Sequence, residues 1–464
     1  MKRRDIELAG SIITTTKPFS LRTLLLIFAL PFIMYGLFGD VRMALVTAVG
    51  TIWLYFAVLV KEEASIGLSA ARIYLPVFFL YSGLSFLGPP MVHTNQMILM
   101  CTLSGLAFAL GWVIALPPGR RTVALPKASG SEPVRQIFKR QLVLTVSVIT
   151  LLTYGYAYSQ AGVLPAFSGN PNLTRVTFLV NGYVSTVVVV GLHIMIACGF
   201  IEMLILKGYR AKFIPGAICL LAIVLALGMS NRGVAVNPLV FALLFVLWRK
   251  NYKLRKLVPI GLFSVAALSV AGYVRNLSSW GESYNTDLQL QGFSGAGVWF
   301  APILNYVYGT AQTFDTTMSV FPGSLPLQMG QQFFSPILME PSVDLYLKDV
   351  FGYDFQGFGL ALGSVNAFYL DWGPLGTFIG PLIIAFCLAF VYRRALSTDD
   401  PRWIILYCYL LMQLIFSVYG HPFAYLFYVI EPFVFFFLIR NHMGTRQIEP
   451  QPAFHSPQSS DRSV

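Results

Sequence analysis

The chain has 464 residues, of which 56% are hydrophobic and only 11% are charged. A soluble globular domain carries about 25% charged residues, so this composition excludes an ordinary soluble protein. The net charge of +12 does not indicate a nucleic-acid partner, because the cations cluster in short loops between apolar runs. These runs are about 20 residues long, enough to cross about 30 Å of hydrocarbon, and they predict an all-α polytopic protein of a lipid bilayer.

About twelve transmembrane helices are predicted from the apolar runs. In chain order they lie near residues 21–39, 43–60, 73–87, 97–116, 142–158, 183–206, 213–229, 234–248, 257–274, 374–392, 403–419 and 423–439. They divide the chain into a block of nine spans, residues 1–274, and a block of three, residues 374–440. One long polar segment, residues 275–373, separates the blocks. The Pro-, Ser- and Gln-rich tail, residues 441–464, is predicted to be disordered and cytoplasmic.

The distribution of lysine and arginine predicts how the chain is oriented. With the N-terminus inside, only five of the 32 lysine and arginine residues fall on the outer side: Arg42, Arg175, Arg232, Arg275 and Lys348. An excess of cations in the inner loops is the general rule for membrane proteins. It predicts that both termini are cytoplasmic and that residues 275–373 form one large extracytoplasmic loop.

Three of the outer arginines are candidates for binding a diphosphate group. Arg232 lies in Ser-Asn-Arg-Gly, between two spans joined almost without a loop, so its side chain is expected at the membrane surface. Arg275 begins the long segment as the ninth span ends, and Arg175 lies in a polar loop. A guanidinium can hold phosphate oxygens through two parallel hydrogen bonds. The alternative for each arginine is an anchor at the lipid headgroups or a helix-end cap.

Carboxylates of the long segment are candidates for a general base. Asp371 stands directly before the tenth span, which predicts a place at the membrane surface. Glu282 and Asp287 closely follow Arg275, and His421, in the turn before the last span, is a fourth candidate. The alternative for each carboxylate is a solvated face, a turn or a helix cap.

Three ionisable residues fall inside predicted spans, where a charge is costly and marks a functional candidate by default. His193 and Glu202 share the sixth span, but nine residues of helix turn through about 900°, so the two point in opposite directions. Glu431, before Pro432 in the twelfth span, is expected to satisfy freed backbone groups or to pair with an arginine. The five cysteines all lie in apolar runs, so neither a disulfide framework nor a metal-binding spacing is predicted.

Two short motifs flank the long segment: Gly228-Met-Ser-Asn-Arg-Gly233 and Phe368-Tyr-Leu-Asp-Trp-Gly-Pro-Leu-Gly376. The part between them contains the Pro-rich stretches Phe321-Pro-Gly-Ser-Leu-Pro and Phe334-Ser-Pro-Ile-Leu. Together they resemble the O-antigen and oligosaccharide repeat-unit polymerases (Wzy-type), over roughly residues 207–394. Members of that family look alike in having about a dozen spans, a Ser-Arg-Gly-like signature at the outer end of a middle helix, and a large outer loop. In this chain Asn231 separates the serine from the arginine.

The resemblance implies a glycosyltransferase of the cytoplasmic (inner) membrane that joins polyprenyl-diphosphate-linked oligosaccharide repeats on its outer face. The arginines would neutralise the departing diphosphate, so neither a metal nor a cofactor is expected. A repeat-unit flippase and a chain-length regulator are the implied protein partners.

Two alternatives remain open at this point. An O-antigen ligase, or another lipid-linked-sugar transferase, shares the same layout of spans and outer loop. A lipid-linked sugar flippase or transporter belongs to a different class and would place polar residues along a cavity at the midplane. The polar residues of this chain concentrate in the outer segment, which favours an enzyme.

Overall fold

The computed structural model describes residues 68–86, 91–115, 137–169, 171–178, 182–250, 301–331, 363–397, 400–420 and 426–439, with a few single positions between 269 and 351. Within these ranges every regular element is a helix and no strand is present. The first two predicted spans, most of the ninth, and the tail 441–464 lie outside the described residues, so the total of twelve spans stays a prediction.

Five of the described helices are long and apolar enough to cross a membrane. They are α4 (Thr94–Ala115), α5 (Arg140–Ala161, followed by the 3-10 helix η3, Pro165–Phe167), α7 (Gly182–Ile205), α8 (Tyr209–Gly228) and α15 (Ser364–Ser397). Four more apolar helices are shorter: α3 (Ala70–Ser85), α9 (Arg232–Lys250), α16 (Pro401–Phe416) and α17 (Leu426–Leu438). Each coincides with a predicted span, and their composition makes this a helical, membrane-embedded protein.

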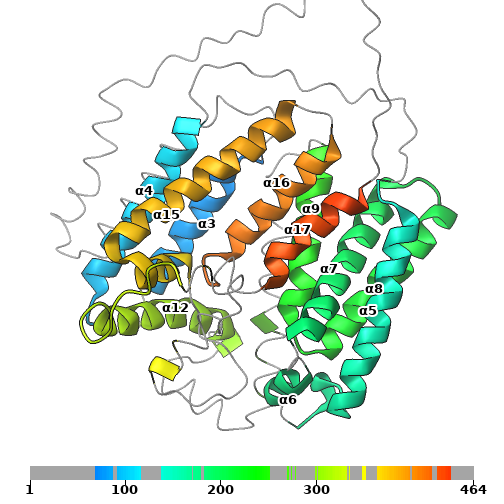
Figure 1. Cartoon of the computed structure of the whole chain (residues 1–464), viewed down its shortest axis with the longest axis horizontal. Coiled ribbons are helices and arrows are strands. Elements are labelled where there is room, and N and C mark those ends of the chain that lie inside the picture. The colour runs from blue at the N-terminus through cyan, green and yellow to red at the C-terminus, as the bar shows by residue number, and fades with distance from the viewer. Residues whose placement is uncertain are drawn as a thin grey trace, which may run out of the picture.

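The helices form two groups that α16 and α17 join (Figure 1). In one group α4 packs along α15 and α3 packs on α4; in the other, α7 packs against α5, α8 and α9. α16 contacts α15, α3 and α9, and α17 contacts α16 and α7. Helices from both ends of the chain therefore build one bundle.

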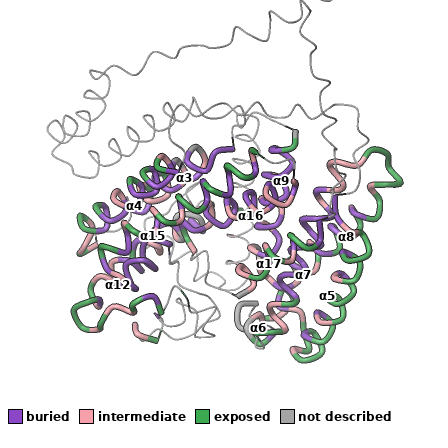
Figure 2. The backbone as a smooth tube through the Cα atoms, turned by 45° about the horizontal axis from the view of Figure 1, so that its top comes forward, coloured by how far each residue is buried: buried purple, intermediate pink, exposed green. Residues whose placement is uncertain are grey.

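In the second group α7 is the buried central helix, and α5 and α8 lie at the outside of the group. Figure 2 shows α7 mostly buried and α5 and α8 with long exposed faces. Large apolar side chains cover those faces, among them Leu152 at 71% exposure and Leu220 at 64%. An apolar surface of this kind suits contact with lipid tails and would be costly in water.

One end of the bundle carries two helices that the sequence analysis assigned to loops. α12 (Ala301–Val320) lies across the ends of α3, α4 and α15, and α6 (Pro171–Phe178) lies beside η3. Buried apolar residues of α12, among them Val307, Ala311 and Phe314, recur at helical spacing, so one mainly apolar face of the helix packs on the bundle. Segment 275–373 is thus not a loop throughout. We call this end the α6–α12 end.

Candidate functional site

The structure shows the positions of only some of the predicted site residues. Glu282, Asp287, Arg275 and His421 lie outside the described residues. For Arg232 the backbone is described, and it is the first residue of α9. Arg175 and Asp371 are described with their side chains.

The structure brings Arg175 and the start of α9 to the same end of the bundle. Only residues 229–231 separate α8 from α9, which begins at Arg232. The hydroxyl of Tyr154 in α5 donates to the carbonyl of Leu225 at 3.0 Å, which holds the end of α8 against α5. α5 leads through η3, which α8 also contacts, into α6, where Arg175 is in the last turn. The unpaired N–H groups at a helix start favour an anion, and the start of α9 presents them at this end.

A kink at Gly373 divides α15 into a short first half, residues 364–372, and a long second half. Gly373 has φ 62° and ψ −151°, a conformation that a glycine adopts without a Cβ clash. Pro374 has no N–H to donate back to the carbonyl of Leu370. The N–H of Gln328, from the segment after α12, donates to that carbonyl instead, at 3.1 Å. The break in the helix is therefore satisfied from a neighbouring segment.

Asp371 ends the short first half of α15 and is completely buried, with an exposure of 0%. Its own carbonyl accepts a hydrogen bond from the N–H of Met329 at 2.9 Å. The side chain of Leu327 lies against Gly373, so the segment 327–329 packs against the kink. The sequence placed Asp371 at the membrane surface, and that depth stays a prediction. The structure adds that the first half of α15 extends the helix beyond the predicted span and that Asp371 is enclosed by protein.

Asp315 attaches α12 to the start of α4. Its carboxylate accepts from the backbone N–H of His93 at 2.6 Å and from that of Val92 at 3.2 Å, and it lies 3.2 Å from the Nδ1 atom of His93. N–H groups at a helix start have no partner inside the helix, and a carboxylate there also meets the positive end of the helix dipole. Of the roles considered for the outer carboxylates, Asp315 takes that of a helix cap.

Replacement of Asp315 by alanine is expected to destabilise the protein by about 1 kcal/mol, because two backbone donors lose their acceptor. The measurement is the melting temperature of the purified full-length protein. Thr316→Ala is the matched control, since Thr316 lies on the same helix and donates to the carbonyl of Gln312 in its own turn. Equal melting temperatures for the two variants would contradict the capping role.

A buried polar cluster joins three helices inside the bundle. Nδ1 of His193 in α7 lies 2.5 Å from Oε1 of Glu431 in α17, and the hydroxyl of Tyr409 in α16 donates to Oε2 of Glu431 at 2.5 Å. Gln413 donates to the Tyr409 hydroxyl at 2.9 Å. All four side chains are at most 5% exposed. Both carboxylate oxygens of Glu431 therefore have a short contact with a buried polar partner.

This cluster corrects two expectations. Glu431 pairs with His193 and Tyr409, whereas the sequence analysis expected an arginine or the backbone before Pro432. Polar residues are also not confined to the outer segment, because this cluster lies among apolar side chains, with the ring of Phe427 edge-on to the imidazole of His193. Among the described residues, no group of three or more His, Cys, Asp or Glu side chains is placed to hold a metal ion.

The chain matches no protein-family model, no curated protein and no solved structure. Its family and activity are therefore argued from its own residues and geometry.

Sequence reasoning missed Tyr409 and Gln413 as members of the polar cluster, and it missed that Asn366 is buried. The signal for Tyr409 and Gln413 was their spacing, since two polar residues four apart in an apolar span share one helix face. Asn366 lies in the sequence that leads into the tenth span, and only the extension of α15 by its short first half shows it to be 1% exposed.

Proposed function

We propose that this protein is a membrane glycosyltransferase that polymerises polyprenyl-diphosphate-linked oligosaccharide repeats on the outer face of the cytoplasmic membrane. The observation that supports the proposal is that Arg175 and the first residue of α9 lie at the same end of the bundle, the α6–α12 end. Two guanidinium groups and a helix start are the groups that bind a diphosphate. Under the predicted orientation this end faces outward, where lipid-linked sugars are the available donors.

The reaction follows from these roles. A hydroxyl of the incoming lipid-linked repeat attacks the anomeric carbon of the growing chain, and the bond from that carbon to the diphosphate oxygen breaks. Arg232 and Arg175, with Arg275, stabilise the negative charge on the departing polyprenyl diphosphate. The proton of the attacking hydroxyl passes to a base, for which the candidates are Asp371, Glu282, Asp287 and His421. Asp371 is completely buried, so it can act as the base only if the protein around it moves to admit the substrate.

Glycan chain length in cells carrying Arg232→Ala at matched expression tests the proposal. The expected result is a collapse of the glycan ladder to single repeats, with partial restoration by Arg232→Lys, because lysine keeps the charge but not the paired hydrogen bonds. Arg210→Ala is the matched control, since Arg210 is exposed at the opposite end of α8 and is expected to leave the ladder intact. An unchanged ladder in Arg232→Ala would remove Arg232 from the site.

An O-antigen ligase or another lipid-linked-sugar transferase keeps the same donor chemistry and differs in the acceptor. Loss of all surface glycan, single repeats included, would favour this alternative or a flippase.

The second candidate function is transport of a lipid-linked sugar, and the buried cluster around Glu431 favours it. Ionisable groups inside the membrane often line transport pathways. An assay with lipid-linked repeats already on the outer leaflet separates the two, because a polymerase lengthens the glycan without any flipping step and a transporter does not.

A further inference from the structure

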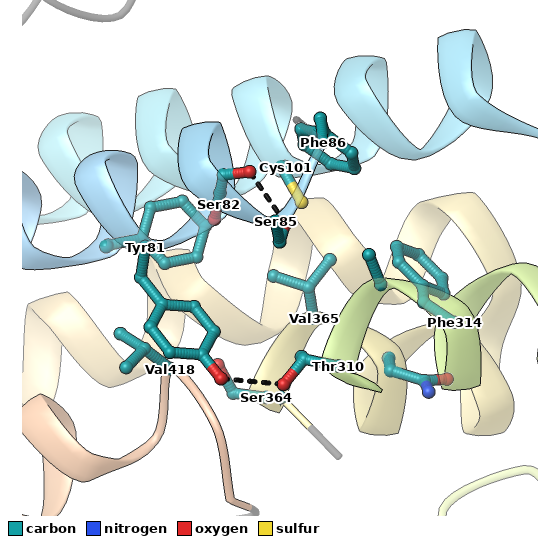
Figure 3. A pocket seen from close by; sticks show the side chains of 14 residues that line it. Tyr81, Ser82, Ser85, Phe86, Cys101, Thr310, Phe314, Ser364, Val365 and Val418 are labelled. Carbon is teal, nitrogen blue, oxygen red and sulfur yellow. Dashed lines mark hydrogen bonds between the residues drawn. The ribbon is translucent and has the colours of Figure 1, made fainter. Parts of the chain in front are cut away.

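The helices α4 and α15 pack side by side, and their inner side is closed by other helices (Figure 1). A cavity of about 30 Å³ lies between α3, α4, α12 and the start of α15, with room for no more than about two water molecules. In its wall the hydroxyl oxygens of Tyr81 and Thr310 lie 2.7 Å apart, and Ser85 donates to the carbonyl of Ser82 (Figure 3). Within the described residues, the surface of this helix pair that a larger molecule can reach is therefore the outer one.

The outer side of α15 carries an apolar stripe. After the kink, its large exposed apolar residues recur every three or four positions and are each between 41% and 64% exposed: Leu375, Ile379, Ile383, Phe386 and Phe390. This spacing places them on one face of the helix. From Leu375 to Phe390 the helix rises about 22 Å, more than the roughly 15 Å that one leaflet contributes to the hydrocarbon core. The stripe is thus long enough to line a whole acyl chain.

A second stripe of the same spacing lies on α4 and consists of Leu99, Leu106, Leu110 and Ile114. The two helices run parallel, since Ser104 donates to the carbonyl of Thr377 and, further along both helices, Gly111 lies against Leu382. Counted at 100° per residue from these contact positions, the stripes turn in opposite senses on the two helices. In parallel helices this puts both stripes on the same side of the pair. We call this surface the α4–α15 face.

Two arginines stand where the α4–α15 face ends. Arg393 and Arg394 are both exposed. Arg393 donates to the carbonyl of Ala115, the last residue of α4, at 3.4 Å, and the Cζ atom of Arg394 lies 5.5 Å from the ring centroid of Phe390, the last residue of the stripe. A guanidinium has five N–H donors, so these contacts leave donors for a phosphate. Both cations are therefore held next to the end of the apolar surface.

No described carboxylate on either helix competes for these arginines. α4 contains no acidic residue, and the one in α15, Asp371, is buried at the far end of that helix. Asp400, which follows α15, accepts from the N–H of Arg402 and lies 3.4 Å from the Nε atom of that residue. The charge at the end of the α4–α15 face is therefore positive.

We propose that the α4–α15 face binds an anionic phospholipid, with the phosphate at Arg393 and Arg394 and the acyl chains along the two stripes. A guanidinium pairs with phosphate oxygens through directed hydrogen bonds, and cations at a membrane surface attract anionic lipids. Under the predicted orientation this lipid lies in the cytoplasmic leaflet, at the end of the bundle opposite to the candidate diphosphate site. The inference does not depend on the proposed function.

Cys387 allows a direct test, because it is exposed next to Phe386 while the other four cysteines are buried. It lies about 10 Å along the helix axis from Arg394, at the depth of the acyl chains. A thiol-reactive fluorophore on Cys387 of the full-length protein in nanodiscs is quenched by brominated acyl chains in contact with it. The probes are brominated phosphatidylglycerol and brominated phosphatidylcholine. Wild type is expected to prefer the anionic lipid about 25-fold, from about fivefold for each arginine.

Arg394→Gln is expected to lower this preference about fivefold, and Arg394→Lys is expected to keep most of it, because lysine retains the charge. Arg210→Gln is the matched control, since it removes an exposed cation at the same end of the bundle from α8, in the other helix group. It is expected to keep the wild-type preference. Equal melting temperatures of Arg394→Gln and wild type would show that the change acts on lipid binding and not on folding.

Equal quenching of wild type by the two lipids overturns the proposal. A preference that Arg210→Gln lowers as much as Arg394→Gln also overturns it, because the attraction would then come from the charge of the whole end of the bundle. Weak quenching by both lipids would show that protein, from this chain or a second copy, covers the α4–α15 face. Displacement of the anionic lipid by soluble glycerol 3-phosphate would show a site for phosphate alone, and either result rejects the lipid site.

Discussion

Replacement of Glu431 by alanine is expected to destabilise the protein, because the buried His193 ring and the buried Tyr409 hydroxyl both lose their hydrogen-bond partner, at about 1–3 kcal/mol for each group left unsatisfied. His193 is 2% exposed and would lose the Glu431 oxygen that its Nδ1 atom contacts, while Tyr409 would lose the carboxylate to which it donates. The measurement is the fraction of full-length protein that stays monodisperse in mild detergent across a temperature series. His193→Ala is expected to cost a similar amount, for the reciprocal reason.

The double variant His193→Leu with Glu431→Leu separates pairing from simple loss of packing. Removing both partners and filling the space with apolar groups is often neutral or stabilising. The double variant is therefore expected to be more stable than either single alanine variant, and the coupling energy should exceed about 1 kcal/mol. Strictly additive losses would show that the two side chains do not depend on each other. Tyr409→Phe, which removes one hydrogen bond and little volume, is expected to cost about 1 kcal/mol.

Replacement of Gly111 by alanine is expected to force α4 away from α15 and to cost about 1–3 kcal/mol, the usual range for overpacking. A Cβ atom at Gly111 would lie 2.3 Å from the carbonyl oxygen of Leu382 and 3.2 Å from the Cβ atom of Ala385. The nearest obstacle is backbone, so no side-chain rotation relieves it. Small residues at membrane helix contacts allow this kind of close backbone approach.

Gly155→Ala in α5 is the matched control, because nothing lies within 4 Å of a Cβ atom placed there. Alanine has the higher helix propensity, so this variant is expected to be as stable as wild type or slightly more stable. The comparison uses the melting temperatures of both full-length variants in the same detergent. If the two variants melt together, the tight contact between α4 and α15 is not present in the protein.

Much of the helical framework could be predicted from hydropathy. α4, α7 and α8 begin and end within a few residues of the predicted spans 97–116, 183–206 and 213–229. The two helices at the α6–α12 end were not predicted, because their apolar residues cover only one face and their composition resembles that of a loop. α12 owes its place to packing: Phe314 and Ala311 are buried only because α3, α4 and α15 lie beneath them.

In the candidate site too, sequence patterns predicted some features, and only the packing of distant segments decided others. The pattern Ser-Asn-Arg-Gly predicted a turn between two helices, and the structure has α9 begin at Arg232. Asp371 was predicted directly before a span, at the membrane surface, and the structure buries it at a kink to which the segment 327–329 is hydrogen-bonded. That segment lies outside the local sequence of Asp371, so no pattern around residue 371 could reveal it.

The sequence by itself determined that this is a helical membrane protein and where most of its described apolar helices lie, because apolar length and composition are local properties that do not depend on which helices are neighbours. Only the tertiary structure decided that His193 meets Glu431, 238 positions away, and that Asn366 is buried. Such contacts depend on the rotation and relative height of helices packed side by side, and packing of many side chains at once sets both.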